Sequence, residues 1–534
     1  MERTDRIDRR ELLSCAGLGA GALILGGVAV DPVAARRPGR RRTPPLARGG
    51  SFPLGVASGQ PATRGISLWT RLNGFDSPQR LRLEVARDPD FRRVIERRVL
   101  RVGPGRDYTI ETRLGRRLLE PGSEYYYRFE TRDQTSMVGR FRTLRPSDSR
   151  EPVRIAFFSC QDYQAGFYGA QSAIANEDLD LAVCLGDYIY ERTFYEGPRR
   201  DTLGANGDGE VQTLPEYRAK YQLYKADPDL QAMHAAHPFL AIWDDHEVED
   251  NYADAAPGDA TQQPRIPFLE RRGAAYQAFY DYMPFSRIAG TPRVGHDLYR
   301  RLTLGANAEL FLLDERQYRD EQPCDDAFFT PCPEAESEPR RFLGRRQLDW
   351  LKRGLRESSA TWKLIGNQLM IMSLDSAPKT PIGKDSWDGY GLERRELMTH
   401  IAARGINDVS FLTGDIHTFF AGEVGLDGRG PERHATEFVG GSITSLSIPE
   451  TLEAITGAPP AGRDAVALVG RNLLLTNPHP RYLDEKNRGY GIVEATQQEL
   501  RVQFKAVDAM QRSSAARTIG SFRVPSGSPR VEVV

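Results

Sequence analysis

The sequence predicts an α/β protein in which an N-terminal antiparallel β-sandwich precedes a larger, layered α/β domain. The length of 534 residues exceeds what one ordinary hydrophobic core supports, so at least two domains are expected. Residues 51–148 alternate apolar and polar side chains in short runs, whereas residues 149–534 contain continuous apolar runs separated by segments with helical spacing. The composition, with 40% hydrophobic and 27% charged residues and a net charge of −1, is typical of a globular protein and indicates no nucleic-acid-binding module.

Residues 1–35 are expected to be a twin-arginine signal peptide rather than part of the fold. Arg9 and Arg10 precede a glycine-rich apolar run, and small residues suited to cleavage follow at 33–35. The twin arginine indicates export of the folded protein by the twin-arginine machinery, to the periplasm or the medium. The alternative is a membrane anchor, since residues 12–30 are almost long enough to span a bilayer. Five glycines in that run weaken this alternative, so no permanent membrane span is expected in the mature protein.

Residues 36–50 are expected to form a basic, proline- and glycine-rich linker, and residues 51–148 an antiparallel β-sandwich. The alternating runs that predict its strands are 65–72, 80–87, 124–132 and 139–144. Alternation turns one face of each strand toward a core and the other toward solvent. Nothing in these runs resembles catalytic chemistry, so this part is interpreted as an accessory domain.

Residues 149–534 are expected to form one layered α/β domain. Its buried strands are predicted by apolar runs that end abruptly in polar residues, at 153–161, 179–187, 239–247, 309–317, 363–372, 408–417 and 436–442. Between them, segments such as 215–236 and 342–358 have helical spacing. In such folds ligands bind beyond the carboxyl ends of the strands. These strand ends carry most of the side chains that could bind a metal or take part in catalysis.

Metal-ligating and ionisable side chains gather at these strand ends: Cys160, Asp187 with Tyr190, the run Asp244–Glu247, Arg316, Asn367, and Asp415 with His417. One carboxylate after a strand usually caps a helix and means little by itself. Several of them at equivalent ends place like charges together, which is costly unless cations neutralise them. The pattern therefore predicts a metal cluster. Carboxylates and amides suit Ca²⁺, Mg²⁺ or Mn²⁺, whereas imidazole and thiolate suit a transition metal.

The motif GDYIYE indicates which transition metal to expect. Asp187 and Tyr190 are spaced so that one turn after the strand aims both at a single ion, although spacing alone does not prefer Tyr190 over Tyr188. An ionised tyrosine requires a strongly acidic metal, because the pKa of a free phenol is about 10. Ferric iron is the expected candidate.

Six segments taken together resemble a known family. SCQDYQAGFYGA, LGDYIYE, LYKADPDLQAMHAAHPFLAIWDDHEVEDNYA, LDERQYRD, DSWDGY and LTGDIHTFF resemble, in order, the successive motifs of PhoD-type alkaline phosphatases. These are exported metallophosphoesterases with an N-terminal β-sandwich, and secreted phospholipase D enzymes of actinomycetes share the motifs. The resemblance implies a metallophosphoesterase-type α/β/β/α catalytic domain, phosphate ester substrates, and an active site with ferric iron and calcium.

The resemblance also implies which residues hold the metals. The iron ligands would be Cys160, Asp187, Tyr190 and His417. Asp187 would bridge to calcium, with Asp415 and one residue of the stretch WDDHEVEDN completing that side. Asp245 is the favoured residue of this stretch, because it stands where broader metallophosphoesterases have an asparagine, and Asn251 is the alternative.

Two further residues are expected to act on the substrate. By the resemblance, His246 stabilises charge on the phosphoryl group or on the leaving oxygen. Arg316 has the planar fork that matches a pair of phosphate oxygens. The alternative for Arg316 is a surface ion pair with Glu315 or Asp320.

The remaining motifs receive structural interpretations or stay open. Cys184 is expected to be an inert core cysteine, and Cys324 and Cys332 a loop disulfide formed after export. Asp385 and Asp388 either shape the rim of the active-site pocket or belong to an ordinary loop. The sequence is compatible with three functions: a phosphomonoesterase and phosphodiesterase, a phospholipase D that uses the same metal site, and a non-enzymatic, calcium-stabilised adhesion protein.

Overall fold

The computed structural model describes residues 45–534, apart from 116, 195–199, 201–209, 261–262, 286–297, 431, 448–449, 451–470 and 514. The predicted signal peptide and most of the predicted linker therefore lie outside the described residues. Every helix among the described residues is too short or too polar to cross a lipid bilayer.

The N-terminal part contains the predicted antiparallel strands. One sheet has the order β4-β3-β6-β7, with β3 Gln79–Ala86, β4 Val94–Val102, β6 Glu124–Glu130 and β7 Gly139–Arg142. Opposite it lie β1 Val56–Ala62, β2 Gly65–Arg71 and β5 Thr109–Leu114. The two layers share one hydrophobic core that includes Leu68, Leu83, Tyr127 and Phe141. The alternating pattern thus correctly predicted a sandwich.

The second layer of this sandwich continues into the rest of the protein. Strand β1 pairs in parallel with β10, Pro238–Ile242, through Ser58 and Pro238. As a result β1, β2 and β5 form one end of a ten-stranded sheet with the order β23-β22-β21-β20-β8-β9-β10-β1-β2-β5. The domain boundary at residue 148 stays a prediction, and the structure adds that hydrogen-bonded pairing crosses it.

The two large sheets supply the strands that end at the site. In the ten-stranded sheet β8 Val153–Phe158, β9 Leu181–Leu185 and β10 are parallel neighbours. The seven-stranded sheet has the order β11-β12-β13-β16-β18-β17-β19. Its strands are β11 Arg300–Leu304, β12 Ala308–Leu312, β13 Trp362–Asn367, β16 Val409–Thr413, β17 Phe419–Val424, β18 Ala435–Gly440 and β19 Pro480–Asp484. Strands β12, β13, β16 and β18 pair in parallel.

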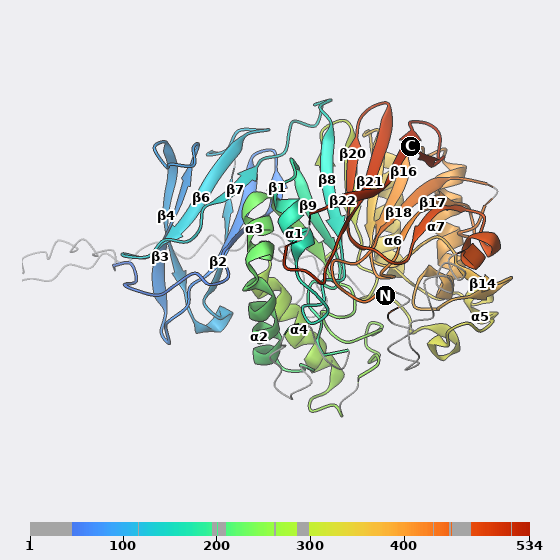
Figure 1. The fold of residues 1–534 in the computed structure, drawn as a ribbon, viewed down its shortest axis with the longest axis horizontal. Coiled ribbons are helices and arrows are strands. Elements are labelled where there is room, and N and C mark those ends of the chain that lie inside the picture. Colours follow the sequence, from blue (N-terminus) through green and yellow to red (C-terminus); the bar gives the residue numbers. More distant parts are fainter. Residues whose placement is uncertain are drawn as a thin grey trace, which may run out of the picture. The chain divides into compact units, whose positions relative to one another are not determined.

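The sheets pack face to face, and helices cover their outer faces (Figure 1). Leu364 and Leu412 join the core shared with the ten-stranded sheet, whereas the next residue along β13, Ile365, joins a second core under the helices. A Cβ atom added to Gly366 would lie 3.1 Å from Leu185 Cδ2, so the two sheets approach closely there. This arrangement of helices, two sheets and helices confirms the predicted α/β fold class.

The helices are short and lie at defined positions. Those packed with the ten-stranded sheet are α1 Gly169–Ala175, α2 Leu214–Lys225, α3 Pro228–Ala236 and α4 Phe268–Tyr282. Those on the seven-stranded sheet are α6 Gly344–Glu357 and α7 Gly391–Ala403, with the short α5 Glu334–Ser337 beside α7. The predicted helical segments 215–236 and 342–358 are thus α2 with α3, and α6.

Further strands were not predicted. At the C-terminal end β20 Arg488–Ala495, β21 Glu499–Val507, β22 Arg517–Pro525 and β23 Glu532–Val533 form an antiparallel extension of the ten-stranded sheet next to β8. A small hairpin joins β14 Asp375–Ala377 and β15 Thr380–Pro381. Cys324 and Cys332 form the predicted disulfide, and Cys184 is buried and free as expected.

Candidate metal centre and active site

The site lies where the carboxyl ends of strands from both large sheets meet. Cys160, Asp187 and the run Asp244–Glu247 follow the parallel neighbours β8, β9 and β10. Asp415 and His417 follow β16 in the facing sheet. Backbone hydrogen bonds tie the loops together, with Cys160 N donating to Gly186 O and Gln161 N donating to Asp187 O. Convergence at one edge follows from the parallel strand order.

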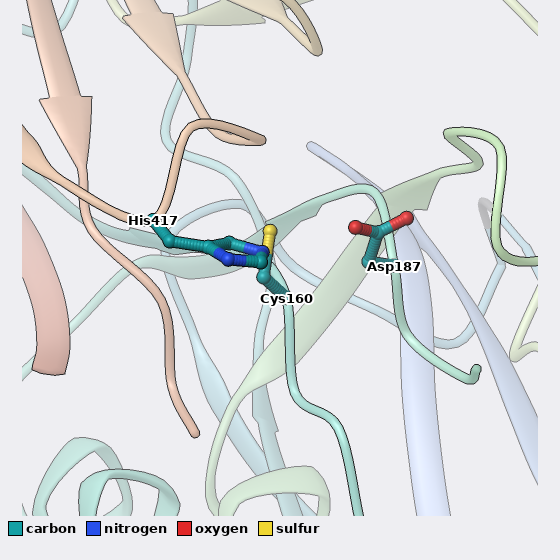
Figure 2. Close-up of side chains that lie close together, drawn as sticks. All are labelled: Cys160, Asp187 and His417. Carbon is teal, nitrogen blue, oxygen red and sulfur yellow. The ribbon is translucent and has the colours of Figure 1, made fainter. Parts of the chain in front are cut away.

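A first cluster contains the predicted iron ligands. Ligand atoms of Cys160, Asp187 and His417 all lie within 4.8 Å of one another. Figure 2 shows the imidazole of His417 beside the Cys160 sulfur, with the Asp187 carboxylate entering from the loop after β9. The Tyr190 hydroxyl joins them, 3.2 Å from Asp187 Oδ2 and 3.3 Å from His417 Nε2. All four side chains therefore face one small volume.

The ring of His417 is oriented for metal binding. Its Nδ1 lies 2.8 Å from Leu446 O, and because a carbonyl only accepts, Nδ1 carries the proton. Burial lowers the pKa of His417 to about 4, so the imidazole is neutral near pH 7. The lone pair is then on Nε2, which faces Tyr190 and the first cluster.

A second cluster shares Asp187 with the first. Ligand atoms of Asp187, Asp245 and His246 lie within 4.8 Å of one another. Asp187 Oδ1 is buried and has no hydrogen-bond partner among the described residues. A buried carboxylate oxygen left without a donor is costly, and a bound cation removes that cost. The shared position of Asp187 fits the bridging role predicted for it.

The charges at the site also fit bound cations. Burial, with Asp245, Asp244 and Glu247 nearby, raises the pKa of Asp187 well above its usual range. Burial, with Asp244, Asp385 and Asp245, raises the pKa of Asp415 in the same way. So many buried acids ionise together only when positive charge compensates them. The donor set of thiol, phenol, imidazole and carboxylates suits a transition metal together with a hard cation.

Asp415 and Asn251 lie outside both clusters but border one cavity. They line a cavity of ≈ 180 Å³ together with Asp385. Asn251 is fixed by its backbone, since its N–H donates to Asp245 Oδ2 at 2.8 Å. Asp245 thus lies in the cluster with Asp187, whereas Asn251 lies at the cavity.

The backbone at the predicted ligands is held in an unusual conformation. Five of these positions have a left-handed φ: Cys160 (57°), Asp187 (54°), Asn251 (59°), Asp415 (64°) and His417 (53°). For residues with a side chain this region is disfavoured, and such strain concentrates at functional sites. The observation supports a functional interpretation independently of side-chain chemistry.

Glu247 holds the strained turn that carries Asp187. Its carboxylate accepts hydrogen bonds from Asp187 N (3.1 Å), Tyr188 N (2.7 Å) and Asp244 N (2.9 Å). Gly186 precedes this turn with φ 114°, and a Cβ atom there would lie 2.4 Å from Asp244 Cβ. Only glycine therefore fits position 186, and Glu247 fixes the direction of the turn.

His246 is oriented by Glu191 and by ring stacking. Its Nδ1 lies 2.9 Å from Glu191 Oε2, and its ring stacks on Tyr190 with centroids 4.1 Å apart. Burial alone would lower the pKa of His246, but Asp245, Asp187 and Glu191 raise it well above its usual range. The site thus contains a positively charged imidazole. Although His246 belongs to the second cluster, the protonated ring has no free lone pair, so Nε2–H is a hydrogen-bond donor there.

The surface ion-pair alternative for Arg316 is wrong. Its side chain is fully buried, with Nε 2.5 Å from Asp244 Oδ1 and Nη2 2.8 Å from Asp385 Oδ2. Asp320 instead pairs with Arg341. In the turn after β12, Asp314 Oδ1 accepts a hydrogen bond from Arg316 N at 3.3 Å.

Several residues of the site carried no assigned role in the sequence. Asp244 and Glu247 belong to the strand-end run 244–247, but their spacing does not predict which of the two carboxylates accepts backbone hydrogen bonds. No sequence pattern singles out Glu191 or Ser445 as part of the site. In the structure, Ser445 Oγ lies 2.7 Å from the Tyr190 hydroxyl. Asp385 lines the cavity, as the pocket-rim interpretation predicted, and so does Asp388.

Comparisons with known proteins show which family and fold the chain resembles. A family model of PhoD-like phosphatases matches residues 155–504, and a model of the PhoD-like phosphatase N-terminal domain matches residues 39–145. Alkaline phosphatase D of Bacillus subtilis (strain 168) is 34% identical over 96% of this chain and 87% of its own length. The solved structure of PhoD aligns with a TM-score of 0.81 and 32% identity over 92% of this chain and 93% of that chain. A purple acid phosphatase from yellow lupin (Lupinus luteus) seeds, 12% identical with a TM-score of 0.50 over 87% of this chain and 73% of its own, shares the fold.

Proposed function

This chain belongs to the PhoD-like phosphatase family and is a phosphoric ester hydrolase, and from this premise we propose an exported phosphatase and phosphodiesterase that uses ferric iron and calcium. The observation that carries the metal proposal is Asp187, which is shared by two clusters and has a buried oxygen that no donor in the described part of the chain reaches. The adhesion alternative is wrong, because the family match covers the region that carries the site.

The proposal assigns the ligands as follows. Iron would be held by Cys160, Asp187, Tyr190 and His417. Calcium would be held by Asp187, Asp415 and either Asp245 or Asn251. Bound cations at these positions would neutralise the phosphate and polarise its P–O bonds.

The remaining residues orient and balance charge. Glu191 fixes the His246 ring through Nδ1, which leaves Nε2–H to donate to an oxygen of the phosphate or of the leaving group. Arg316 balances Asp244 through Nε and Asp385 through the fork of its guanidinium, so its part in the proposal is to place positive charge behind these carboxylates, and direct contact with the phosphate would require Asp385 to move. Burial of these groups strengthens their electrostatic effect on the substrate.

The function is tested by metal removal and restoration. The mature protein is expected to hydrolyse p-nitrophenyl phosphate and bis-p-nitrophenyl phosphate, and to contain iron as isolated. Chelation should abolish both activities, and calcium with iron should restore them. An iron-free protein that keeps full activity after chelation would contradict the proposal.

Export is supported by the N-terminal sequence and by the Cys324–Cys332 disulfide, since such bonds persist in oxidising compartments. Replacing Arg9 and Arg10 by lysine should retain the protein in the cytoplasm, as measured by cell fractionation. The matched control replaces Arg36 and Arg37 by lysine, beyond the expected cleavage site. Equal export of both variants would contradict the twin-arginine route.

A further inference from the structure

A largely apolar cavity opens beside the carboxylates of the site. Of the residues that line its ≈ 180 Å³, Asn251, Asp385 and Asp415 belong to the metal-centre region. The apolar wall consists of Phe328, Met370, Met372, Leu374, Ile382 and Ile416. Asp415 lines this cavity and is also a proposed calcium ligand. A phosphate ester bound at the proposed metal ions would therefore place its organic substituent next to the apolar wall.

Buried acids hold the wall rigidly. Glu437 accepts from Ile371 N at 2.9 Å and from Met372 N at 2.7 Å, which fixes the turn after β13. Asp388 accepts from Leu374 N at 3.0 Å. The wall is therefore formed before any ligand binds, as expected of a binding pocket.

The disulfide loop supplies the mouth of the cavity. Phe329 N donates to Ile382 O at 3.0 Å, and Ile382 N donates to Leu374 O at 3.0 Å, so the loop is tied to the wall. The Phe328 side chain is 57% exposed although it lines the cavity. A Cβ atom on Gly383 would lie 3.3 Å from Phe328 Cε1, so glycine lets the ring lie close against this edge.

We infer that this cavity is a subsite for an apolar organic group of the phosphate ester, with the size of one aromatic ring or a short alkyl chain. The inference rests on the proposed function and deepens it by naming the substrate class. A cavity of about 150 Å³ lined by leucine, isoleucine and phenylalanine binds benzene, so ≈ 180 Å³ suits a single ring. The two acyl chains of a phospholipid do not fit this volume. The subsite therefore favours aryl and short alkyl phosphates over phospholipids.

Non-hydrolysable phosphonates separate binding from turnover. The metal-loaded protein is titrated with methyl-, butyl-, phenyl- and dodecylphosphonate, by calorimetry and by inhibition of p-nitrophenyl phosphate hydrolysis. Each buried methylene strengthens binding about fourfold, so butyl- and phenylphosphonate should bind about 10- to 60-fold more tightly than methylphosphonate. Dodecylphosphonate should gain little beyond butylphosphonate, because the cavity is filled.

Variants of the wall locate the effect. Ile382→Asn should reduce the butyl-to-methyl affinity ratio to within about threefold, because it places an amide against the ligand's methylenes. The matched control is Ile406→Asn, another half-buried isoleucine packed against the same core but not lining the cavity, which should keep the full ratio. Phe328→Ser changes an exposed side chain and carries the test if Ile382→Asn does not fold, and it should lower the phenyl-to-methyl ratio severalfold.

The possible outcomes test the apolar subsite and the phosphoesterase function separately. Inhibition by all phosphonates without preference for butyl or phenyl would overturn the subsite and leave the phosphoesterase function intact. Affinity that keeps rising to dodecyl, or faster hydrolysis of phosphatidylcholine vesicles than of phenyl phosphate, would overturn the size limit and favour the phospholipase D alternative. Failure of any phosphonate to bind or inhibit, with no hydrolysis of p-nitrophenyl phosphate, would overturn the proposed function itself.

Discussion

The two sides of the site balance charge in different ways. On the thiolate side, defined as Cys160, Tyr190 and His417, burial raises the pKa of the thiol and of the phenol and lowers that of the imidazole, so all three are neutral without a cation. On the carboxylate side, defined as Asp244, Asp245, Asp385 and Arg316, a buried guanidinium pairs with the acids. The thiolate side thus loses protons to bind a metal, whereas the carboxylate side contains its own cation.

The largest effect should come from removing that cation. Arg316→Met leaves the buried Asp244 without its partner, whereas Asp385 keeps its pair with Arg319, so the free energy of unfolding of the metal-free protein should fall by about 3–5 kcal/mol through Asp244. Urea denaturation measures the change. Arg341→Met, which breaks the surface pair with Asp320, is the matched control and should cost less than about 1 kcal/mol. Equal losses in both variants would show that Arg316 does not balance the cluster.

A buried cation away from the site shows the opposite case. Lys225 is 1% exposed and contacts the rings of Trp69 and Tyr188, and burial lowers its pKa to about 7. Since the unfolded chain keeps this proton up to about pH 10, stability rises between pH 7 and pH 10. Lys225→Met should therefore stabilise the protein by about 1–4 kcal/mol at pH 7, and the gain should shrink toward pH 10.

Thermal or urea unfolding across this pH range checks that prediction. A gain in stability that does not depend on pH, or a loss of stability at pH 7, would show that burial of the Lys225 amine does not destabilise the folded protein. Together with Arg316→Met, the result tells whether buried charge in this fold is tolerated only beside carboxylates.

The smallest of the three effects should come from the support of the Asp187 turn. Glu247→Gln weakens the acceptor of three backbone N–H groups, and loss of such support typically lowers metal affinity about 10- to 100-fold. Competition with a chelator measures the change for iron. Glu309→Gln, another buried glutamate that pairs with Arg301 away from the site, serves as control. Unchanged iron affinity in Glu247→Gln would remove the positioning role.

Strand ends were the part of the site that the sequence revealed. Cys160, Asp187 and His417 each follow a continuous apolar run, and parallel order brings such ends together. The partners of Arg316 could not be predicted, because Asp385 comes from a distant loop and no local pattern connects the two. The surface pair with a sequence neighbour, given as the alternative to phosphate binding, is excluded by the long-range packing that buries Arg316.

In the fold, too, local sequence patterns predict individual strands but not the pairing of strands that are distant in the chain. Strand β21 has the alternation that predicts a strand, with Leu500, Val502 and Phe504 buried between exposed residues, and this signal went unused. By contrast, the parallel pairing of β1 with β10 joins segments far apart in the chain. No periodicity encodes such a pairing, so the continuity of the sandwich with the large sheet became visible only in the structure.

The bridging role of Asp187 determines whether both metals bind, and metal content tests this role most directly. Iron and calcium per protein chain are measured by elemental analysis in Asp187→Asn and in Tyr190→Phe, with circular dichroism to confirm folding. Asp187→Asn should lose both metals, whereas Tyr190→Phe should lose iron and keep calcium. Retention of either metal at the wild-type level in a folded Asp187→Asn protein would contradict the bridging role.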